Sequence, residues 1–457
     1  MAVRWQVYLA KLGTPVGGDH DGTEYLEEHT LIYDTSVLNS EHTDKDEYII
    51  YDPVLTREAN QAGSFECDIP PYNNGYDSFS TYGENVSGIL DTYVSVYRDG
   101  DPIWQGRITE IAIDFNKNKH IYAEGDMALY NDFQVKVDWS KYITYIEETS
   151  KYQNDIARFF SDMAQIPTDL PYGTEGKMIS PSIVWGDAEF PLIVTHTVTS
   201  NVDDTVYMSR WDALTDSFLN GMMGNQKNCT YIYITRERTS SSAIIFKRIL
   251  NLLILKTDGS VWYGEAPLTQ QTIEYGKNLS DLSVSFTGNG IYTAIHIYGY
   301  TTKGWWIFKS TSEIDTTVYN LPLIAQYGWI EKTLSVDGES STIKTLTEMA
   351  TNELNTVNNS AVVEVEITIK AIDLAYTGDE TDHLDFMKRT HIISEPHGID
   401  GIYLCTKTVE HLDDPSQNEY TFGRTTNTLS TRQASSGRKT DKSYDISTTT
   451  KSYVTNS

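Results

Sequence analysis

The stretch from Tyr51 to Asp132 contains two informative runs, YDPVLTREANQAGSFECDIP (51–70) and YVSVYRDGDPIWQGRITEIAIDFNKNKHIYAEGDMALYND (93–132). Apolar and polar residues alternate in both runs, which is typical of half-buried strands. Asp99-Gly100 interrupts the alternation, and Asp-Gly favours a tight hairpin because glycine accepts a positive φ. A second turn at 116–119 separates another alternating pair. The stretch therefore predicts an antiparallel meander that can close into a barrel.

A second β-rich region follows much later in the chain. Residues 290–300 and 362–374 alternate over long stretches, and 362–374 is the clearest strand pattern of the sequence. A helix is predicted between them at 342–357, where apolar residues recur at helical spacing. The regions 1–136 and 272–430 are therefore candidates for two distant copies of one antiparallel barrel.

The residues between these two regions have a different character. Helical spacing of apolar residues predicts helices at 140–163 and 205–223, and two strands are expected at 230–235 and 250–257. This part is interpreted as a separate α+β domain. The predicted fold class is thus a multidomain, β-rich α+β protein with two antiparallel β-barrels and an α+β domain between them.

The predicted domain boundaries follow these changes of pattern. Residues 1–136 form the first barrel, 137–271 the α+β insertion, and 272–433 the second barrel with the helix at 342–357 and a terminal subdomain. Residues 434–457 are rich in Ser and Thr, with few apolar residues to bury, and are expected to be a flexible tail or a strand donor. A chain of 457 residues has room for roughly three domains.

The charge of the chain argues against one broad class of partner. It has 35 Lys and Arg against 64 Asp and Glu, a formal net charge of −29. Nucleic-acid affinity depends on neutralising phosphates, so sequence-specific nucleic-acid binding is not expected. Solubility alone is the simplest explanation of the acidity. No apolar run reaches the roughly 18 residues that span a bilayer, and the N-terminus has no signal-peptide pattern, so no membrane insertion is expected.

The cysteines do not suggest a disulfide framework or a metal site. Cys67, Cys229 and Cys405 are far apart and odd in number, which fits neither paired bridges nor a CxxC motif. They are expected to be reduced and mostly buried.

Two histidines, His397 and His20, are candidates for a metal ligand or an acid–base group. His397 precedes Asp400 closely, but no second ligand has a recognisable spacing, which favours a turn histidine bonded to backbone. His20 lies between two aspartates, as in a cation-binding loop, but lacks the later ligand of a calcium loop. It is expected to be an exposed turn.

Paired acids and tryptophans give no catalytic signature either. The adjacent acids are Glu147-Glu148, Asp203-Asp204 and Asp413-Asp414. Glycosidases use two facing carboxylates, whereas adjacent acids point apart. Trp305-Trp306 could stack on sugars, but an interface or core pair is favoured. GxSxG, HExxH and phosphate-loop motifs do not occur, so no catalytic, cofactor-binding or metal-binding residue is predicted.

Three separated clusters carry a family resemblance. The first is the opening stretch, with Gly106-Arg107 after a strand and Glu124-Gly125 before Leu129-Tyr130-Asn131-Asp132. The second is Tyr275–Leu279 with Tyr292-Thr293. The third comprises Tyr327–Ile330, Ala371–Leu374, Ser394–Asp400, Asp414-Pro415-Ser416 and Phe422-Gly423. In this order they resemble the gp27-like hub family of phage tails, which includes the N-terminal hub region of tail-associated lysin and prophage endopeptidase tail proteins.

The resemblance implies a structural protein without enzymatic activity, located at the tail tip or baseplate of a virion and made in the host bacterial cytoplasm. It implies a homotrimer in which six barrels around a three-fold axis join a six-fold tail tube to a three-fold tip. The implied partners are the distal tail protein ring, the tape measure protein and a tip or spike protein. Because the ring passes DNA or tape measure, we expect acidic side chains of the barrels to line its lumen.

The family pattern also implies a set of structural turns. Glycine at 106, 276 and 328 is expected where a side chain would obstruct the barrel wall, and 394–398 is expected to be a rigid turn. The full set is Gly106, Arg107, Gly125, Gly276, Asn278, Gly328, Pro396, His397 and Gly398. Asp385–Arg389 departs from the family pattern, which has a Gly-Asp turn there.

A competing interpretation is a secreted carbohydrate-active or carbohydrate-binding protein, suggested by the acidity and the aromatic content. Glycan turnover by the purified chain would favour it, whereas a mass near three times 51.7 kDa would favour the trimeric hub.

Overall fold

The computed structural model describes residues 3–12, 26–38, 45–79, 88–138, 141–146, 151–154, 156–164, 184–185, 205–222, 229–238, 246–256, 260–287, 292–303, 310–336, 342–360, 364–378 and 382–423. The predicted tail at 434–457 lies outside these ranges. Within the described part, no helix combines the length and the apolar character needed to cross a membrane.

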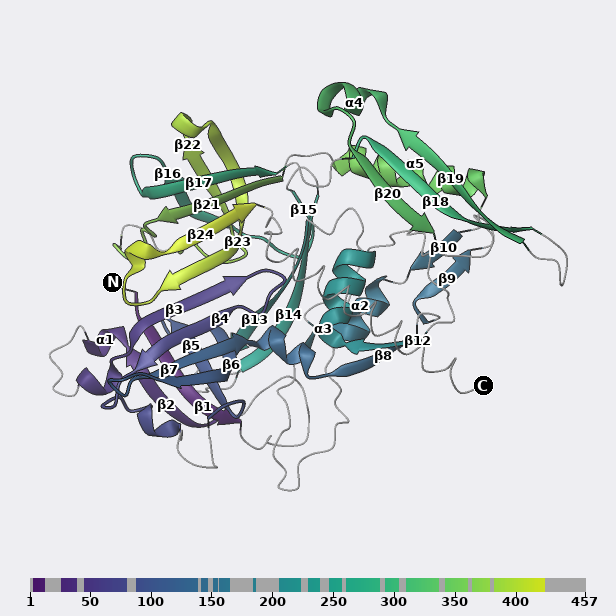
Figure 1. The fold of residues 1–457 in the computed structure, drawn as a ribbon. Helices are drawn as coiled ribbons and strands as arrows, with labels where there is room; N and C mark the ends of the chain where they lie inside the picture. Colours follow the sequence, from purple (N-terminus) through teal and green to yellow (C-terminus); the bar gives the residue numbers. More distant parts are fainter. Residues whose placement is uncertain are drawn as a thin grey trace, which may run out of the picture.

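Seven strands of the N-terminal region form one half of a large sheet (Figure 1). They are β1 (Trp5–Leu12), β2 (Leu26–Asp34), β3 (Tyr51–Glu58), β4 (Ser64–Ile69), β5 (Thr92–Arg98), β6 (Asp101–Ile113) and β7 (Lys119–Gly125). The predicted hairpins are confirmed: β5 pairs with β6, and β6 with β7. At the first turn Asp99 and Gly100 have φ of 52° and 88°, the left-handed geometry that an Asp-Gly turn supplies. Short helices flank the strands: α1 (Thr35–Leu38), η1 (Lys45–Tyr48), η2 (Tyr76–Ser78) and η3 (Asp126–Asn131).

The C-terminal strands continue the same sheet. They are β16 (Leu268–Glu274), β17 (Leu279–Thr287), β21 (Glu364–Ala371), β22 (Arg389–Ser394), β23 (Ile399–His411) and β24 (Glu419–Gly423), with η7 (Glu395–His397) and η8 (Pro415–Gln417) between them. Strand β23 pairs with β3 in antiparallel register, from Lys407 opposite Glu58 to His411 opposite Val54. The order β17-β21-β24-β23-β3-β4-β7-β6-β5-β1-β2 therefore joins two β-rich regions that the sequence pattern had separated. The finer prediction of two barrels stays a prediction.

The apolar core under this sheet follows the alternation of its strands. In β4 the side chains of Phe65, Cys67 and Ile69 are buried, with less buried residues between them. They pack in one cluster with Trp104 of β6 and with Leu412, which follows β23. Each fully buried large apolar side chain contributes about 1.5–3 kcal/mol. The core, like the sheet, is shared between the first and the last part of the chain.

The middle region contains strands where helices had been predicted. Strands β9 (Ile143–Ile146) and β10 (Lys151–Asn154) pair in antiparallel register, and among the described residues of 140–163 the helical ones belong to α2 (Ile156–Ala164). The helix predicted at 140–163 is therefore wrong at the described residues 143–146 and 151–154, because β-branched and aromatic residues at 142–146 suit a strand as well as a helix face.

The second predicted helix also begins later than expected. Residues 205–209 are strand β12 (Thr205–Ser209), paired with β8 (Gln134–Asp138). The Ser209 hydroxyl caps the following helix by accepting a hydrogen bond from the Asp212 amide at 3.0 Å. The helix comprises α3 (Arg210–Asp212) and a π-helical segment, η5 (Ala213–Met222). A four-stranded sheet contains β11 (Val184–Trp185), β13 (Thr230–Arg238), β14 (Phe246–Leu255) and β15 (Val261–Tyr263). Helix α2 and segment η5 share a core cluster with β13, β14 and β15.

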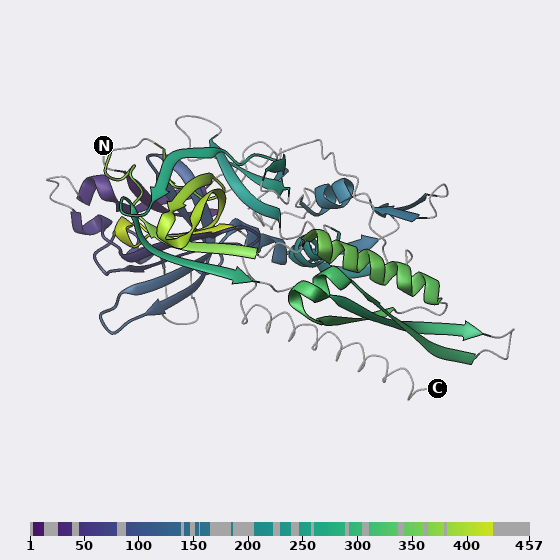
Figure 2. The ribbon, with the colours of Figure 1, turned by 90° about the horizontal axis from the view of Figure 1, so that it is seen from above.

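A small two-layer module lies between β17 and β21 in sequence and projects from the large sheet (Figures 1 and 2). Its sheet contains β18 (Ala294–Lys303), β19 (Ser310–Tyr319) and β20 (Glu331–Val336). Helix α5 (Ile343–Ser360) covers one face, and α4 (Leu321–Tyr327) connects β19 to β20. The helix predicted at 342–357 is thus present. The strands predicted near 290–300 and 331 form this sheet, which is separate from the large one.

Candidate functional site

Four charged side chains meet where the first and last parts of the sheet join. Arg57 on β3 and Arg98 on β5 come from the N-terminal region, and Glu410 on β23 comes from the C-terminal region together with Asp385, which precedes β22. Arg57 donates to Glu410 Oε2 at 2.6 Å and to Asp385 Oδ1 at 2.7 Å. Arg98 donates to Asp385 Oδ2 at 2.6 Å and lies 3.4 Å from Glu410 Oε1. We call these four residues the ionic junction.

Burial makes the ionic junction sensitive to any unbalanced charge. The side chains of Arg57, Arg98 and Glu410 are 9%, 8% and 1% exposed. Burial alone would raise the pKa of Asp385, but the charges of Arg98 and Arg57 outweigh it and hold that pKa well below its usual range. Two arginines and two carboxylates sum to zero, and removal of any one leaves a buried charge without its partner.

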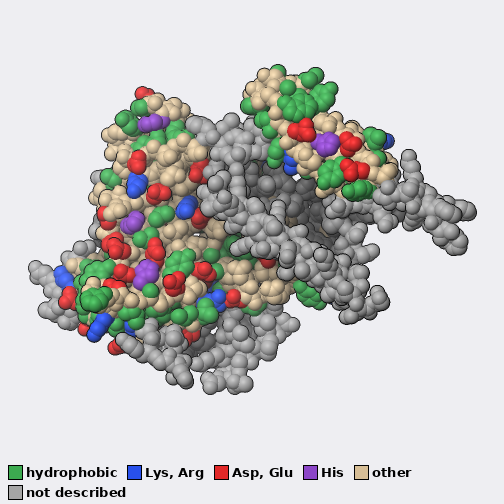
Figure 3. Space-filling view, viewed as in Figure 1, with side chains coloured by type: hydrophobic (Ala, Val, Ile, Leu, Met, Phe, Trp, Pro, Cys, Tyr) green, Lys and Arg blue, Asp and Glu red, His purple; other side chains and the backbone are tan. Residues whose placement is uncertain are grey.

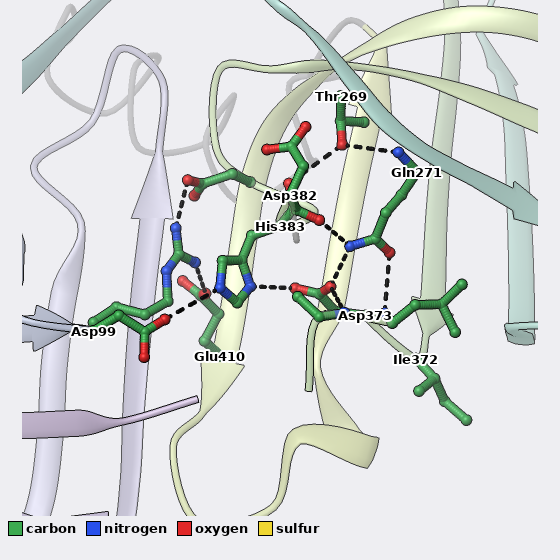
Figure 4. A network of polar contacts seen from close by, with 12 residues as sticks. Asp99, Thr269, Gln271, Ile372, Asp373, Asp382, His383 and Glu410 are labelled. Carbon is green, nitrogen blue, oxygen red and sulfur yellow. Dashed lines mark hydrogen bonds and ion pairs between the residues drawn. The ribbon is translucent and has the colours of Figure 1, made fainter. Parts of the chain in front are cut away.

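A hydrogen-bonded layer extends the ionic junction toward β16 (Figure 4). His383 Nδ1 lies 2.8 Å from the buried carboxylate of Asp373, and its Nε2 lies 3.5 Å from Asp99 in the β5–β6 turn. Gln271 of β16 donates to Asp373 at 2.5 Å. His383 therefore connects a turn of the N-terminal region to the interior of the C-terminal one.

A second buried cluster connects the N-terminal region to the middle region. Asp126 at the start of η3 forms ion pairs with Arg236 of β13 and, at 2.8 Å, with Arg248 Nε of β14. Burial raises the pKa of Asp126 to about 6, while the charge of Arg236 acts in the opposite direction. A cavity of about 220 Å³ lies between the two clusters, lined among others by Arg57, Arg236 and Asp385.

This arrangement suits cohesion better than chemistry. The carboxylates of the ionic junction are paired with guanidinium groups, which donate hydrogen bonds but do not release a proton at ordinary pH and so cannot serve as general acids. Among the residues that the structure describes, no three His, Cys, Asp or Glu side chains converge as a metal site would need. The two ion-pair clusters join the N-terminal region of the chain to its C-terminal region and to its middle region.

The predicted turn glycines fall into two physical classes. At Gly106 a Cβ would lie 2.4 Å from the Glu124 carbonyl oxygen, and at Gly125 it would lie 1.9 Å from the Ala62 carbonyl oxygen. Close backbone approach therefore requires glycine at both positions. Gly276 and Gly328 have φ of +80° and +79° and open space around them. Their requirement is the left-handed backbone, so the expected obstruction of a barrel wall is wrong for these two.

The other predicted positions are placed by local hydrogen bonds. Asn278 is buried, accepts from the Glu274 amide at 2.9 Å and donates to the Thr272 carbonyl at 3.2 Å. Arg107 of β6 pairs with Asp132 at 2.7 Å. They lie at different places in the fold and form no common site.

The turn at 394–398 is a short 3-10 helix, η7, with Pro396 in its first turn and a left-handed Gly398 as its end. His397 lies in this turn, as predicted, but its Nδ1 bonds the Ser394 hydroxyl at 2.7 Å and not the backbone. Asp400 bonds His391 at 2.7 Å. The sequence proximity of His397 and Asp400 therefore does not make a pair.

The remaining candidates show no convergence. His20, Glu147-Glu148, Asp203-Asp204 and Trp305-Trp306 lie outside the described residues. Asp414 caps η8 by accepting from Ser416. Cys67, Cys229 and Cys405 are all buried, as predicted.

The residues of the ionic junction were not singled out from the sequence. Glu410 follows the alternation of a half-exposed strand, and its partners Arg57 and Arg98 are 353 and 312 positions away. One signal did exist. Asp385 belongs to the segment 385–389 that departs from the family pattern, and its carboxylate is part of the ionic junction.

The ionic junction and the β3–β23 pair hold the first and last parts of the chain in one shared β-sheet. Residues 268–433 match the family described as prophage endopeptidase tail, so the chain carries a phage tail protein region and the resemblance drawn from its sequence is confirmed. No curated protein matches the chain.

Three solved structures resemble the chain over most of its length. They are a 43 kDa tail protein of prophage MuSo2 from Shewanella oneidensis (10% identity, TM-score 0.42, 92% of this chain and 98% of that one), a tail protein from Neisseria meningitidis (12%, 0.42, 92% and 96%) and prophage tail protein gp18 from Listeria monocytogenes (13%, 0.40, 95% and 98%).

Proposed function

We propose that the protein is a structural hub at the tip of a phage or phage-like tail, without enzymatic activity of its own. The observation that carries the proposal is the family match at 268–433, a region whose strands continue the N-terminal sheet through the β3–β23 pair. A hub must keep distant parts of the chain in one rigid wall, and the buried ionic junction supports that requirement.

In the proposed assembly three copies form a ring that joins the six-fold tail tube to the three-fold tip. The ring contacts the distal tail protein, the tape measure protein and a tip or spike protein, and DNA or tape measure passes through it. The formal charge of −29 suits a channel that repels the phosphate backbone.

Measurement of the mass in solution tests the proposal. A trimer of 51.7 kDa subunits has a mass of about 155 kDa (3 × 51.7), and tagged chains should appear at one end of purified tails by electron microscopy. A monomer that hydrolyses cell-wall glycan or peptide would refute the structural role. A trimer with a basic channel would refute the electrostatic part alone.

A further inference from the structure

The β18–β20 sheet has one covered and one open face. Ile295 and Ile297 of β18 pack with Leu346 and Ala350 of α5 in a separate core cluster. The side chains of Tyr298 and the alternate residues of β18 point away from α5, because successive residues of a strand face opposite sides. Figure 3 shows this open face toward the viewer, with histidine and acidic side chains among apolar ones.

Acidic and aromatic side chains alternate across the open face. Tyr298 is directly opposite Asp315 of β19, and Tyr300 is directly opposite Glu313. The side chain of Tyr300 is 41% exposed. The Cβ atoms of directly opposite residues lie about 5 Å apart, so each tyrosine has an acidic residue as its neighbour on the adjacent strand.

The face continues into an exposed apolar tip. Tyr319 and Trp329 are 54% and 55% exposed, and their rings lie 6.0 Å apart. Leu321 at the start of α4 is 67% exposed, and α4 has no buried residue. We call Tyr298, Tyr300, Tyr319, Trp329, Glu313 and Asp315 the aromatic–acidic face.

The tip is held rigidly although it is exposed. The buried Thr293 hydroxyl donates to the Gly328 carbonyl at 2.9 Å and accepts from the Ile330 amide at 2.7 Å. The Trp329 indole donates to Glu331 at 3.0 Å. Ordered exposed aromatic side chains lose little conformational entropy on binding, which is a property of interface hot spots.

The negative charge of the open face favours a partner surface with positively charged side chains. At the open-face positions of β18, β19 and β20 among the described residues, Glu313, Asp315 and Glu331 are acidic and none is Lys or Arg. Arginine and lysine both pair with carboxylates and stack on aromatic rings. A strongly acidic second copy of this chain is a poorer electrostatic match.

We propose that the aromatic–acidic face docks a different protein of the tail, through a surface that presents Arg or Lys side chains beside apolar ones. This rests on the proposed function in one respect, that the chain is part of an assembled tail. Cations of the partner occupy the positions between the tyrosines and the carboxylates, and its apolar side chains cover Trp329 and Tyr319.

Two measurements on purified tail particles and on the free full-length chain test the docking. Hydroxyl-radical footprinting should show Tyr298, Tyr300 and Trp329 protected in the particle and labelled in the free chain. Zero-length carbodiimide cross-linking should join Glu313 or Asp315 to a lysine of a different protein, while arginine contacts appear as protection of the same segment.

Each other result overturns the inference. Equal labelling in particle and free chain removes the docking but leaves the hub intact, whereas absence of the chain from particles removes the hub and the docking together. Cross-links to a second copy of this chain, or protection produced by purified cell-wall glycan alone, assign the face to another occupant.

Two variants distinguish an effect of charges on the aromatic–acidic face from an effect of the chain's overall negative charge. Glu313→Gln/Asp315→Asn should reduce incorporation into particles by about tenfold or more at physiological salt, since rim charges control association. Glu348→Gln on α5, whose side chain is 65% exposed, removes a charge on the opposite layer and should leave incorporation unchanged. An equal loss in both variants refutes a specific face, and circular dichroism confirms that both fold.

Discussion

Replacing Glu410 by Gln keeps the size of a buried side chain and removes its charge. Glu410 is 1% exposed and accepts from Arg57 at 2.6 and 3.1 Å, with Arg98 at 3.4 Å. The ionic junction changes from neutral to a net charge of +1 inside the protein. Breaking a buried ion pair in this way typically costs about 3–5 kcal/mol.

Hydrogen exchange of the β3–β23 amides measures this cost locally. At 1.4 kcal/mol per factor of ten, the amides that pair 54–58 with 407–411 should exchange about a hundred to a few thousand times faster in Glu410→Gln. Glu274→Gln is the control, because Glu274 pairs with the exposed Lys277, 70% accessible, and such pairs contribute about 0–1 kcal/mol.

A second variant tests whether unbalanced charge is the cause. Adding Arg98→Met to Glu410→Gln leaves Arg57 with Asp385, again a neutral set, and should restore at least about 1 kcal/mol of the lost protection. Exchange rates in Glu410→Gln within threefold of the wild type, or an equal effect of the control, would contradict the reasoning.

Three further predictions concern single positions. Gly125→Ala places a Cβ 1.9 Å from a backbone carbonyl oxygen and should abolish soluble expression, whereas Gly276→Ala, with φ of +80° but open space, should lower the unfolding free energy by only about 1–2 kcal/mol. Because the folded pKa of Asp385 lies below its ordinary 3.8, its stabilisation is present above pH 4 and should disappear as pH falls further; the denaturation midpoint should drop over that range and drop less in Asp385→Asn. Burial raises the pKa of the Cys67 and Cys405 thiols, so a thiol reagent at pH 8 should modify them only after unfolding, and rapid modification of the native protein would contradict their burial.

Local signals predicted the local structure well. Asp99-Gly100 gave the β5–β6 hairpin because its left-handed turn is encoded by two adjacent residues. The helix at 342–357 was recognisable because one apolar face repeats over several turns. At 140–155 the pattern is ambiguous, since β-branched residues fit both periods, and the structure has paired strands at 143–146 and 151–154.

Long-range pairing could not be read from the same patterns. Nothing near Glu410 in the sequence shows that Arg57 is its partner, because their contact depends on the register of β3 with β23, in which Arg57 lies opposite Thr408. An acidic residue in an alternating strand usually faces solvent, and it is buried only where tertiary contacts supply a partner for its charge. The ionic junction can therefore be recognised only in the three-dimensional structure. Of its four residues, only Asp385 lies in the segment, 385–389, that departs from the family pattern.

The β3–β23 pair also determines the order in which the chain can fold during synthesis. Arg57 and Glu410 are separated by 353 residues, which a ribosome translates in on the order of 20–70 s at typical rates. During that interval the edge of β3 has no strand to pair with, and Arg57 and Arg98 have no carboxylates from the C-terminal region. The nascent N-terminal region thus emerges with an open strand edge and two uncompensated cations, a form suited to chaperone binding and vulnerable to aggregation until the last strands are complete.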